Sequence, residues 1–288
     1  MMNFLKLVSI AVVYLGLLSP SLGQTLYFSA IPDEDETALM DRFSKVADYL
    51  SEKLDVPVEF VPVKSYPAAV TAFRNDQIQL AWFGGLSGVQ ARLLSPGAKA
   101  IAQGAEDMEF VTYFIAHESL GLKETPEFPV EALKGKTFTF GARTSTSGRL
   151  MPEFYIRDAT GGAPEEFFSR VGFSGDHSQT LRLVASGAWQ VGALNFAVYD
   201  KAVTDDAPEI KTAGIIWRTP PYPDYNWTIR GDMDARFGTG FTDRVQAALI
   251  EMTEPELLAS FPRSAFVPAR NEDFDPIEKT GRALGLIE

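Results

Sequence analysis

Three consecutive hydroxyl residues, Ser145, Thr146 and Ser147, stand directly before Gly148, ahead of a segment with a helical pattern of apolar residues. Small residues between a strand and a helix let the backbone curl, so that several N–H groups point at one position. The helix dipole and the hydroxyl donors favour negative charge at the same position. The pattern therefore predicts a cradle for a tetrahedral oxyanion. The simpler alternative is that Ser145 or Ser147 only caps the helix.

His177 is one of two histidines in the chain, and it follows the short polar segment Ser174-Gly175-Asp176. We expect its imidazole to donate a hydrogen bond to the anion, more strongly if the ring is protonated. A purely structural histidine is the alternative. The other histidine, His117, is expected at a crossing between lobes and is given no functional role.

Strands and helices alternate along most of the chain, which indicates an α/β protein with mainly parallel sheets flanked by helices. Apolar residues at helical spacing predict helices in residues 39–54, 66–74 and 242–252, among others. The expected strands are residues 26–31, 56–63, 78–83, 99–103, 109–116, 136–141, 170–173, 191–194, 210–217 and 227–230.

Ligands of open α/β sheets bind beyond the carboxyl ends of the strands. The hydroxyl cradle and His177 are expected there, and so are Tyr66, Phe83 and Asn195. Tyr66 and Tyr222 have polar tips, so either is a candidate for contact with the ligand. Phe83 is a candidate for a wall of the cleft.

The order of the elements predicts two lobes joined by two crossings. Residues 219–224 contain the densest cluster of prolines, which we interpret as the second crossing. The segment after it has too little strand for a third domain, so we expect it to complete the first lobe. The predicted division is a signal peptide in residues 1–23, a first lobe in 24–116 and 222–288, and a second lobe in 117–221.

The first 23 residues differ from the rest, because Lys6 is their only charge and residues 7–18 form an apolar run. This pattern predicts a signal peptide cleaved near Gly23. A membrane anchor is the alternative, but a spanning helix needs about 20 apolar residues. The chain has no cysteine, which excludes disulfides and a cysteine-linked lipid anchor. We therefore expect a soluble periplasmic protein.

The formal net charge of −12 disfavours nucleic acid and anionic membranes as partners. The chain contains none of the G-x-S-x-G, HExxH and Walker A motifs. Two distant histidines without cysteine disfavour a zinc site. We therefore expect no enzyme activity, no metal and no cofactor. A ferric site of carboxylates with Tyr222 and Tyr225 is one alternative, and a hydrolase using Ser147 and His177 is another.

Five segments resemble the phosphonate and phosphite substrate-binding proteins of ABC transporters, and together they cover nearly all of the chain after residue 23. They are FSAIPDEDETALMDRFSKVADYLSEKLDVPVEFVPVKSYPAAVTAF, LAWFGGLSGVQARL, FGARTSTSGRLMP, VGFSGDHSQTLRLVASG and SAFVPARNEDFDPI. An STSG element followed downstream by G-x-H is the specific part of this resemblance. The WFGGLSGVQAR segment most resembles a subgroup described as selenate-binding.

The resemblance implies the type II periplasmic binding protein fold, with two lobes and a hinge that closes on the ligand. It implies that Ser145, Thr146 and Ser147 hold the anion oxygens from the second lobe, and that His177 contacts the anion. By the same resemblance Tyr66 closes the first-lobe side.

Three further site residues are implied by the resemblance. Phe83 lies in the loop that faces Tyr66, and Tyr222 lies near the last crossing. Asn195 falls near the position where many relatives present an acid to the ligand. An asparagine tolerates a dianion that a carboxylate would repel, so this position shifts our expectation from phosphite and phosphonate towards selenate or sulfate.

The expected function is capture of a small tetrahedral oxyanion, such as selenate, phosphonate or phosphite, between the lobes. The protein is expected to act as a monomer and to deliver the anion to an inner-membrane ABC permease with its ATPase. A secreted hydrolase of phosphate or ester substrates is the alternative, and a sensor that signals through a partner is a third possibility.

Overall fold

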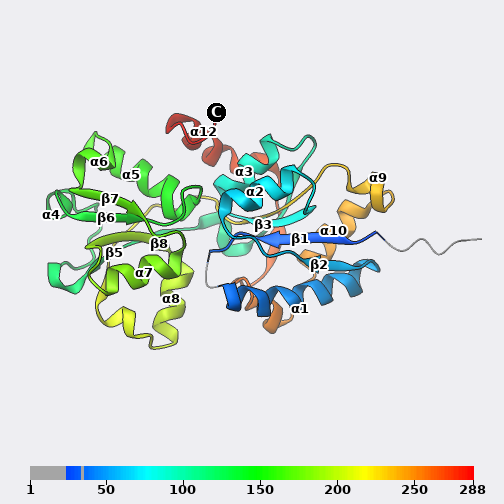
Figure 1. Ribbon diagram of the computed structural model, residues 1–288, viewed down its shortest axis with the longest axis horizontal. Coiled ribbons are helices and arrows are strands. Elements are labelled where there is room, and N and C mark those ends of the chain that lie inside the picture. Colours follow the sequence, from blue (N-terminus) through cyan, green and yellow to red (C-terminus); the bar gives the residue numbers. More distant parts are fainter. Residues whose placement is uncertain (1–23, 34–35) are drawn as a thin grey trace, which may run out of the picture.

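The computed structural model describes residues 24–33 and 36–288, so the predicted signal peptide in residues 1–23 lies outside the described residues. The described chain forms two α/β lobes that lie side by side (Figure 1). Each lobe is built on its own sheet, as the alternation of strands and helices predicted.

The sheet of lobe 1 has six strands in the order β11-β4-β10-β3-β1-β2. They are β1 (Leu26–Ala30), β2 (Val58–Phe60), β3 (Leu80–Phe83), β4 (Lys99–Gly104), β10 (Asn226–Ile229) and β11 (Phe266–Pro268). β1 pairs in parallel with β2 and β3, whereas β10 is antiparallel to β3 and β4. Every residue of β3 is buried, as expected for a continuously apolar strand inside a sheet.

The sheet of lobe 2 has five strands in the order β7-β6-β8-β5-β9. They are β5 (Thr112–His117), β6 (Thr137–Phe140), β7 (Arg170–Phe173), β8 (Val191–Asn195) and β9 (Ala213–Arg218). β6 is parallel to β7 and β8, and β5 is antiparallel to β8 and β9. In each lobe, the first strand after a crossing, β5 or β10, therefore runs against its neighbours.

Helices cover both faces of each sheet (Figure 1). In lobe 1, α2 and α3 lie on one face and α1 and α10 on the other; in lobe 2, α5 and α6 lie opposite α7 and α8. The helices are α1 (Glu36–Leu54), α2 (Tyr66–Arg74), α3 (Gly85–Leu93), α4 (Val130–Leu133), α5 (Met151–Thr160), α6 (Pro164–Phe167), α7 (His177–Ala185), α8 (Phe196–Thr204), α9 (Met233–Phe237), α10 (Phe241–Ile250), α11 (Pro255–Leu258) and α12 (Asp275–Ala283).

The two crossing segments pair with each other and form the hinge. Phe110 and Tyr222 exchange two backbone hydrogen bonds, of 2.9 and 3.0 Å. We expected lobe 1 to extend to residue 116, but β5 pairs with β8 and β9 from Thr112 onwards. The first crossing therefore lies before Thr112, because the apolar run at 109–116 does not itself mark where one sheet gives way to the other.

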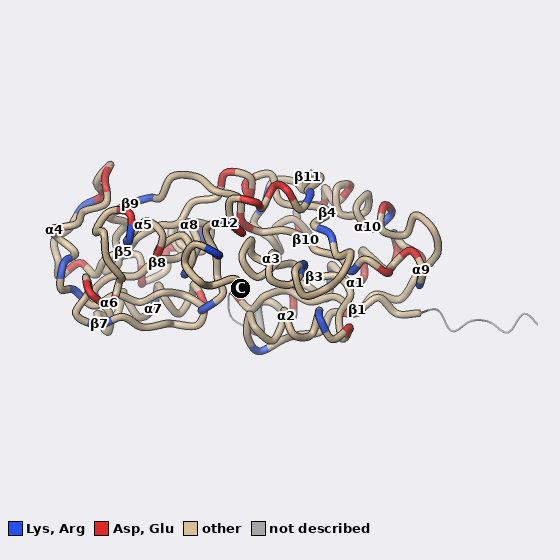
Figure 2. Tube along the Cα trace, turned by 90° about the horizontal axis from the view of Figure 1, so that it is seen from above, with Lys and Arg blue, Asp and Glu red and all other residues tan. Residues whose placement is uncertain are grey.

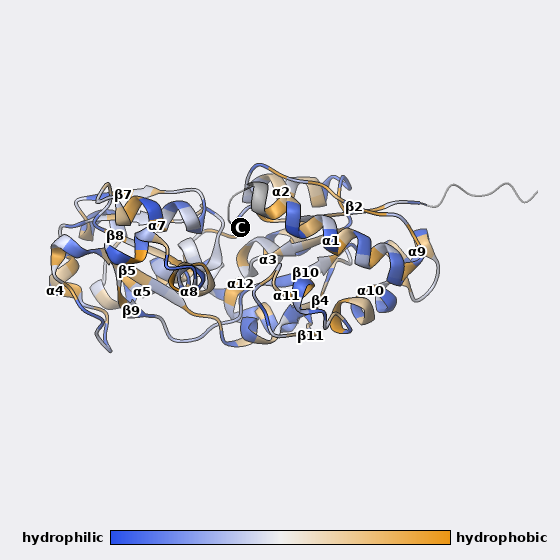
Figure 3. Ribbon diagram, turned by 90° about the horizontal axis from the view of Figure 1, so that it is seen from below, coloured by the Kyte–Doolittle hydropathy of each residue, from blue (hydrophilic) through white to orange (hydrophobic). Residues whose placement is uncertain are grey.

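Helix α1 is amphipathic and buries one face. The buried positions of α1 follow the helical spacing expected from the sequence: Leu39, Phe43, Val46, Leu50 and Leu54. Helices such as α1 and α10 accordingly carry both hydrophobic and hydrophilic residues (Figure 3). Charged residues of both signs are scattered over both lobes (Figure 2).

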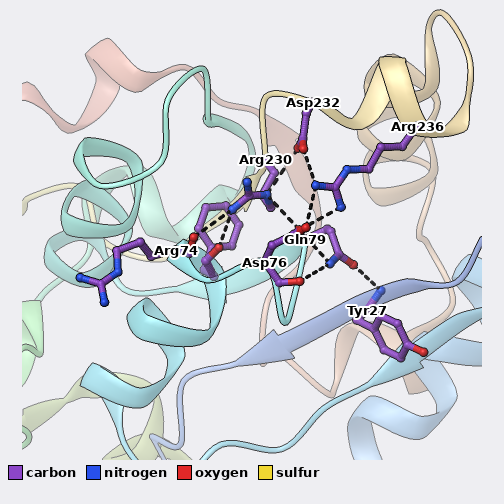
Figure 4. A network of polar contacts seen from close by, with 8 residues as sticks. Tyr27, Arg74, Asp76, Gln79, Arg230, Asp232 and Arg236 are labelled. Atoms are coloured by element: carbon purple, nitrogen blue, oxygen red, sulfur yellow. Dashed lines mark hydrogen bonds and ion pairs between the residues drawn. The ribbon is translucent and has the colours of Figure 1, made fainter.

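A network of charged residues holds α9 against the loop before β3 in lobe 1 (Figure 4). Arg236 donates two hydrogen bonds to the carboxylate of Asp76, at 2.9 and 2.7 Å. Arg230 forms an ion pair with the same carboxylate at 3.2 Å. Gln79 donates to Asp76 and accepts the backbone N–H of Tyr27 at 3.0 Å, so the network also reaches β1.

Candidate anion-binding site

The hydroxyl cradle forms a π-turn, Thr146–Leu150, between β6 and α5. Ser145 caps this turn, because its Oγ accepts the N–H of Gly148 at 2.9 Å. Its hydroxyl proton is still able to donate to another group. The first N–H groups of such a turn have no partner within it. The capping role considered for Ser145 is therefore present, and it is compatible with an anion cradle.

Gly148 is required by close packing behind the cradle. A Cβ at this position would lie 3.0 Å from Ser145 Oγ, 3.1 Å from Gly141 Cα and 3.1 Å from His177 Cε1. The N–H of Gly141 donates to the carbonyl of Gly148 at 2.7 Å. The absence of a side chain therefore lets the cradle approach both β6 and His177.

Lobe 1 contacts the cradle across the cleft through the N-terminus of α3. The N–H of Leu86 donates to Thr146 Oγ1 at 2.9 Å, and the N–H of Gly85 donates to Asp224 Oδ1 at 2.8 Å. Thr146 belongs to lobe 2 and Asp224 to the second crossing. Because the bond from Leu86 to Thr146 joins lobe 1 directly to lobe 2, the structure shows the lobes in a closed arrangement.

Asp224 is a further candidate, which no pattern in the sequence indicated. Its carboxylate is buried, and its Oδ2 has no hydrogen-bond partner within the described part of the chain. Burial raises the pKa of Asp224 to about 7, although hydrogen bonds from Gly85 and Thr146 oppose this shift. A carboxyl group with this pKa is able to hold or accept a proton near neutral pH.

His177 is the first residue of α7 and is completely buried. Its Nδ1 accepts the backbone N–H of Asn195 at 3.2 Å, which assigns the ring proton to Nε2. Nε2 lies 3.5 Å from Ser147 Oγ. Burial lowers the pKa of His177 to about 3, so the ring is a neutral donor at physiological pH. The same burial disfavours the protonated form that we considered.

Tyr66 reaches the same region from the N-terminus of α2 in lobe 1. Its hydroxyl is buried without a hydrogen-bond partner among the residues that the structure describes. Burial, followed by the charges of Asp33 and Asp224, raises the pKa of Tyr66, whereas the nearby hydroxyl of Ser145 lowers it. A buried hydroxyl without a partner costs free energy that an anion oxygen would recover.

Three predicted contact residues serve other purposes in the structure. Phe83 is fully buried in the core of lobe 1, where its ring lies 5.7 Å from that of Phe73. Tyr222 bonds through its hydroxyl to Thr112, which donates to the carbonyl of Ser147 at 2.9 Å. An aromatic residue at a strand end or crossing supports the cradle or the core as readily as it contacts a ligand.

Asn195 is the third of these residues. Its Oδ1 accepts the N–H of Ala197 at 2.7 Å and caps α8, and its Nδ2 donates to the hydroxyl of Tyr225 at 3.1 Å. The carboxylate near the cradle is instead that of Asp224. The expectation that an asparagine replaces this acid, and with it the shift towards selenate or sulfate, is therefore not supported.

The arginines that flank the cradle stack on aromatic rings. The guanidinium of Arg143 lies 4.0 Å from the centre of the Phe173 ring, and that of Arg149 lies 4.3 Å from Phe140. Arg149 also forms an ion pair with Glu153. The buried donors at the site are uncharged: the hydroxyls of Tyr66, Ser145 and Ser147, backbone N–H groups, and His177 Nε2.

A groove of about 530 Å³ opens between the lobes beside these donors. Tyr66 and Phe60 line it from lobe 1, and Ala142, Phe173 and Asp176 line it from lobe 2. Tyr66 belongs both to this groove and to the buried site. The groove therefore marks the side on which the site adjoins solvent.

The geometry does not suit a serine hydrolase. A general base for Ser147 would need a free lone pair on the nearest histidine nitrogen. In His177 that nitrogen, Nε2, carries the proton, and Nδ1 contacts a backbone N–H rather than a carboxylate. Within the described chain, no group of three or more His, Asp or Glu side chains is placed to hold a metal ion.

The family model described as the periplasmic substrate-binding protein of phosphonate ABC transporters matches residues 28–274. This chain belongs to that family. The match confirms the resemblance drawn from the STSG and G-x-H elements, and the binding-protein interpretation holds over the hydrolase alternative. Proteins of this phosphonate-binding family are periplasmic components of ABC transporters rather than enzymes.

A similar relative is the probable ABC transporter phosphite-binding protein PhnD1 of Prochlorococcus marinus strain MIT 9301. It is 39% identical over 272 residues, covering 92% of this chain and 91% of the relative. The structure of PhnD1 in complex with methylphosphonate matches with a TM-score of 0.88 and covers 91% of this chain and 99% of that one.

A binding component of a phosphonate ABC transporter from Pseudomonas aeruginosa shares the fold at 18% identity. Its TM-score is 0.77, covering 90% of this chain and 85% of that chain. These structures confirm the type II periplasmic binding protein fold. In the region that the structure describes, no helix has the length and hydrophobicity to cross a membrane.

Proposed function

We propose that this member of the phosphonate-binding family captures phosphite or a small phosphonate such as methylphosphonate between its lobes. The observation that carries the proposal is a buried set of uncharged donors from both lobes, which lies beside Asp224 Oδ2, an oxygen without a hydrogen-bond partner among the described residues. The donors from lobe 2 are the hydroxyls of Ser145 and Ser147, the backbone N–H of Thr146 and the imidazole of His177, and the donor from lobe 1 is the hydroxyl of Tyr66.

The carboxyl group of Asp224 favours an anion that carries a proton. Monoanions of phosphite and phosphonates keep a P–OH group, which donates to an ionised carboxylate. Sulfate and selenate have no such proton near neutral pH, so their oxygens would face a second negative charge. Specificity of this kind arises because a buried acceptor without a donor is costly.

The extent of burial limits the size of the ligand. The side chains of Ser145, Thr146 and Ser147 are at most 2% exposed, and that of His177 is 0% exposed. A ligand held by these groups in the closed arrangement has little room for a large substituent. We therefore favour phosphite and methylphosphonate over bulky phosphonates.

Closure explains how binding at the site leads to transport. The two lobes contribute donors to one position, so the ligand makes all its bonds only in the closed state and stabilises that state. We propose that the exported protein, cleaved near Gly23, acts as a monomer and passes its ligand to an inner-membrane ABC permease with its ATPase.

Isothermal titration of the ligand-stripped protein tests the proposal. We expect phosphite and methylphosphonate to bind with dissociation constants in the micromolar range or below, about −8 kcal/mol or better. Sulfate and selenate should bind at least about 100-fold more weakly, a difference of about 2.7 kcal/mol. Equal affinity for selenate and phosphite, or no heat with any phosphorus oxyanion, would overturn the proposal.

A further inference from the structure

Four hydrogen bonds form a closed ring that joins the lobes beside the anion site. The hydroxyl of Tyr225 donates to Asp33 Oδ2 at 3.0 Å and accepts from Asn195 Nδ2 at 3.1 Å. The backbone N–H of Asn195 donates to His177 Nδ1 at 3.2 Å. The backbone N–H of His177 donates to the carbonyl of Asp33 at 3.1 Å, which completes the ring.

The ring connects lobe closure to the histidine that faces the ligand. Asp33 and Tyr225 belong to lobe 1, and Asn195 and His177 belong to lobe 2. Two of the four bonds, Asn195 to Tyr225 and His177 to Asp33, therefore cross the cleft. They are made only when the lobes approach each other, whereas the bond from Asn195 to His177 lies within lobe 2.

Tyr225 is rigidly held at its place in the ring. Its side chain is 2% exposed and stacks on Trp82, with ring centres 5.5 Å apart. The guanidinium of Arg263 lies 5.2 Å from the same ring. A hydroxyl fixed in this way has little rotational freedom to lose when it meets Asn195, so the bond across the cleft forms at small entropic cost.

We propose that Tyr225 is a positioning residue for anion binding, which locks Asn195 and thereby His177 in place when the lobes close. It acts without touching the ligand. Tyr225 accepts from the side chain of Asn195, and the backbone N–H of Asn195 holds His177 with Nε2 towards Ser147. The inference rests on the proposed function, because the ligand is the group to which Nε2 donates.

Tyr225→Phe removes only the hydroxyl and keeps the stacked ring. We expect phosphite and methylphosphonate to bind roughly tenfold more weakly, mainly through faster dissociation, because the hydrogen bond from Asn195 across the cleft, which only the closed state makes, is lost. Asn195→Ser tests the same link from lobe 2, since serine still caps α8 but is too short to reach Tyr225. We expect a similar loss for this variant.

Tyr199→Phe is the matched control. Tyr199 is also buried, and its hydroxyl donates to the carbonyl of Ala213 at 2.9 Å within lobe 2. This variant should bind both ligands as the wild type does. An equal loss of affinity in Tyr199→Phe would show that any buried hydroxyl has this effect, which would overturn the inference.

A double variant that combines Tyr225→Phe with Asn195→Ser separates positioning from a general loss of stability. If Tyr225 acts through Asn195, the double variant should bind within about twofold of the weaker single variant. Losses that simply multiply, to roughly 100-fold, would overturn the inference. Wild-type affinity of Tyr225→Phe for both anions would also overturn the inference, but it would leave the proposed function intact. Failure of the wild-type protein to bind either anion would overturn the proposed function, and this inference with it.

Discussion

The carboxylate of Asp224 spans the gap between the hinge and lobe 1, because its Oδ1 accepts the N–H of Gly85 at 2.8 Å. Its other oxygen remains buried and unpaired in the described structure. A helix N-terminus stabilises the ionised form, but burial opposes it more strongly and brings the pKa of Asp224 to about 7. One proton is thus shared between this carboxyl group and the bound anion in our account.

Binding should weaken as the pH rises above about 7. Because the pKa of Asp224 is raised to about 7, the proton shared with the anion is retained below this pH. As the pH rises through this value the proton is lost, and the closed, liganded state loses the stabilisation that the proton gives. We expect the affinity of the wild type for phosphite to fall by up to about tenfold per pH unit above pH 7. Asp224→Asn should show a flatter profile in titrations between pH 6 and 9. Identical slopes in the two proteins would exclude Asp224 as the proton acceptor.

Ser147→Ala should weaken phosphite binding by about 1–3 kcal/mol, because a donor to a charged group is lost. Titration calorimetry measures this change directly. Ser186→Ala is a suitable control, since Ser186 is exposed and its hydroxyl donates only to the nearby carbonyl of Leu183. An unchanged dissociation constant in Ser147→Ala would remove this hydroxyl from the site.

His177 should contribute equally at all pH values near neutrality. Its pKa of about 3 lies below the ordinary 6.5, so the folded protein keeps the ring neutral and this contribution is lost only in acid. We expect the affinity ratio of wild type to His177→Ala to be constant between about pH 5 and 8. A ratio that grows towards pH 5 would show that an imidazolium binds the anion.

Much of the fold followed from local patterns in the sequence. The helix predicted at 66–74 is α2, because its apolar spacing and the cap at Ser65 are local features. The strand expected from residue 210 begins instead at Ala213, because Pro208 starts a 3-10 turn. Apolar runs alone do not distinguish such a turn from the start of a strand.

Most residues of the candidate site were indicated where they form a continuous motif, and Tyr66 was indicated by its polar tip at the end of a strand. Ser145–Ser147 and the loop before His177 each lie in one segment and are brought together by β6 and α7. Asp224 escaped prediction because a single acid after a proline cluster has no pattern, and its partner Gly85 is 139 positions away. Phe83 was assigned to the cleft because an aromatic residue at a strand end is the same in sequence whether it faces ligand or core.

Gly148→Ala should impair binding more than folding. The added methyl group would lie about 3 Å from Ser145 Oγ and from the His177 ring, so the cradle must move away from its partners. We expect at least a tenfold loss of affinity, equivalent to about 1.4 kcal/mol. Gly214→Ala provides the control, since nothing lies within 4 Å of a Cβ at that position. Equal affinities in the two variants would contradict the close packing described above.

Asp76→Asn should lower the stability of lobe 1 without changing affinity. The carboxylate pairs with Arg230 and Arg236 on the surface, and its hydrogen bonds lower the pKa of Asp76 against the opposing effect of burial. Asparagine tolerates the positive φ of 63° at this position. Because the pair is partly exposed, we expect a loss of about 1 kcal/mol in chemical denaturation. A changed dissociation constant for phosphite would show that the network communicates with the cleft.

The central claim is that the buried donors of both lobes surround one small phosphorus oxyanion. A crystal structure of the protein with methylphosphonate tests it most directly. Our account predicts phosphonate oxygens within hydrogen-bonding distance of Ser147 Oγ, His177 Nε2 and the Tyr66 hydroxyl, with one oxygen facing Asp224 Oδ2. A ligand bound elsewhere, with these four groups turned away from it, would contradict the account.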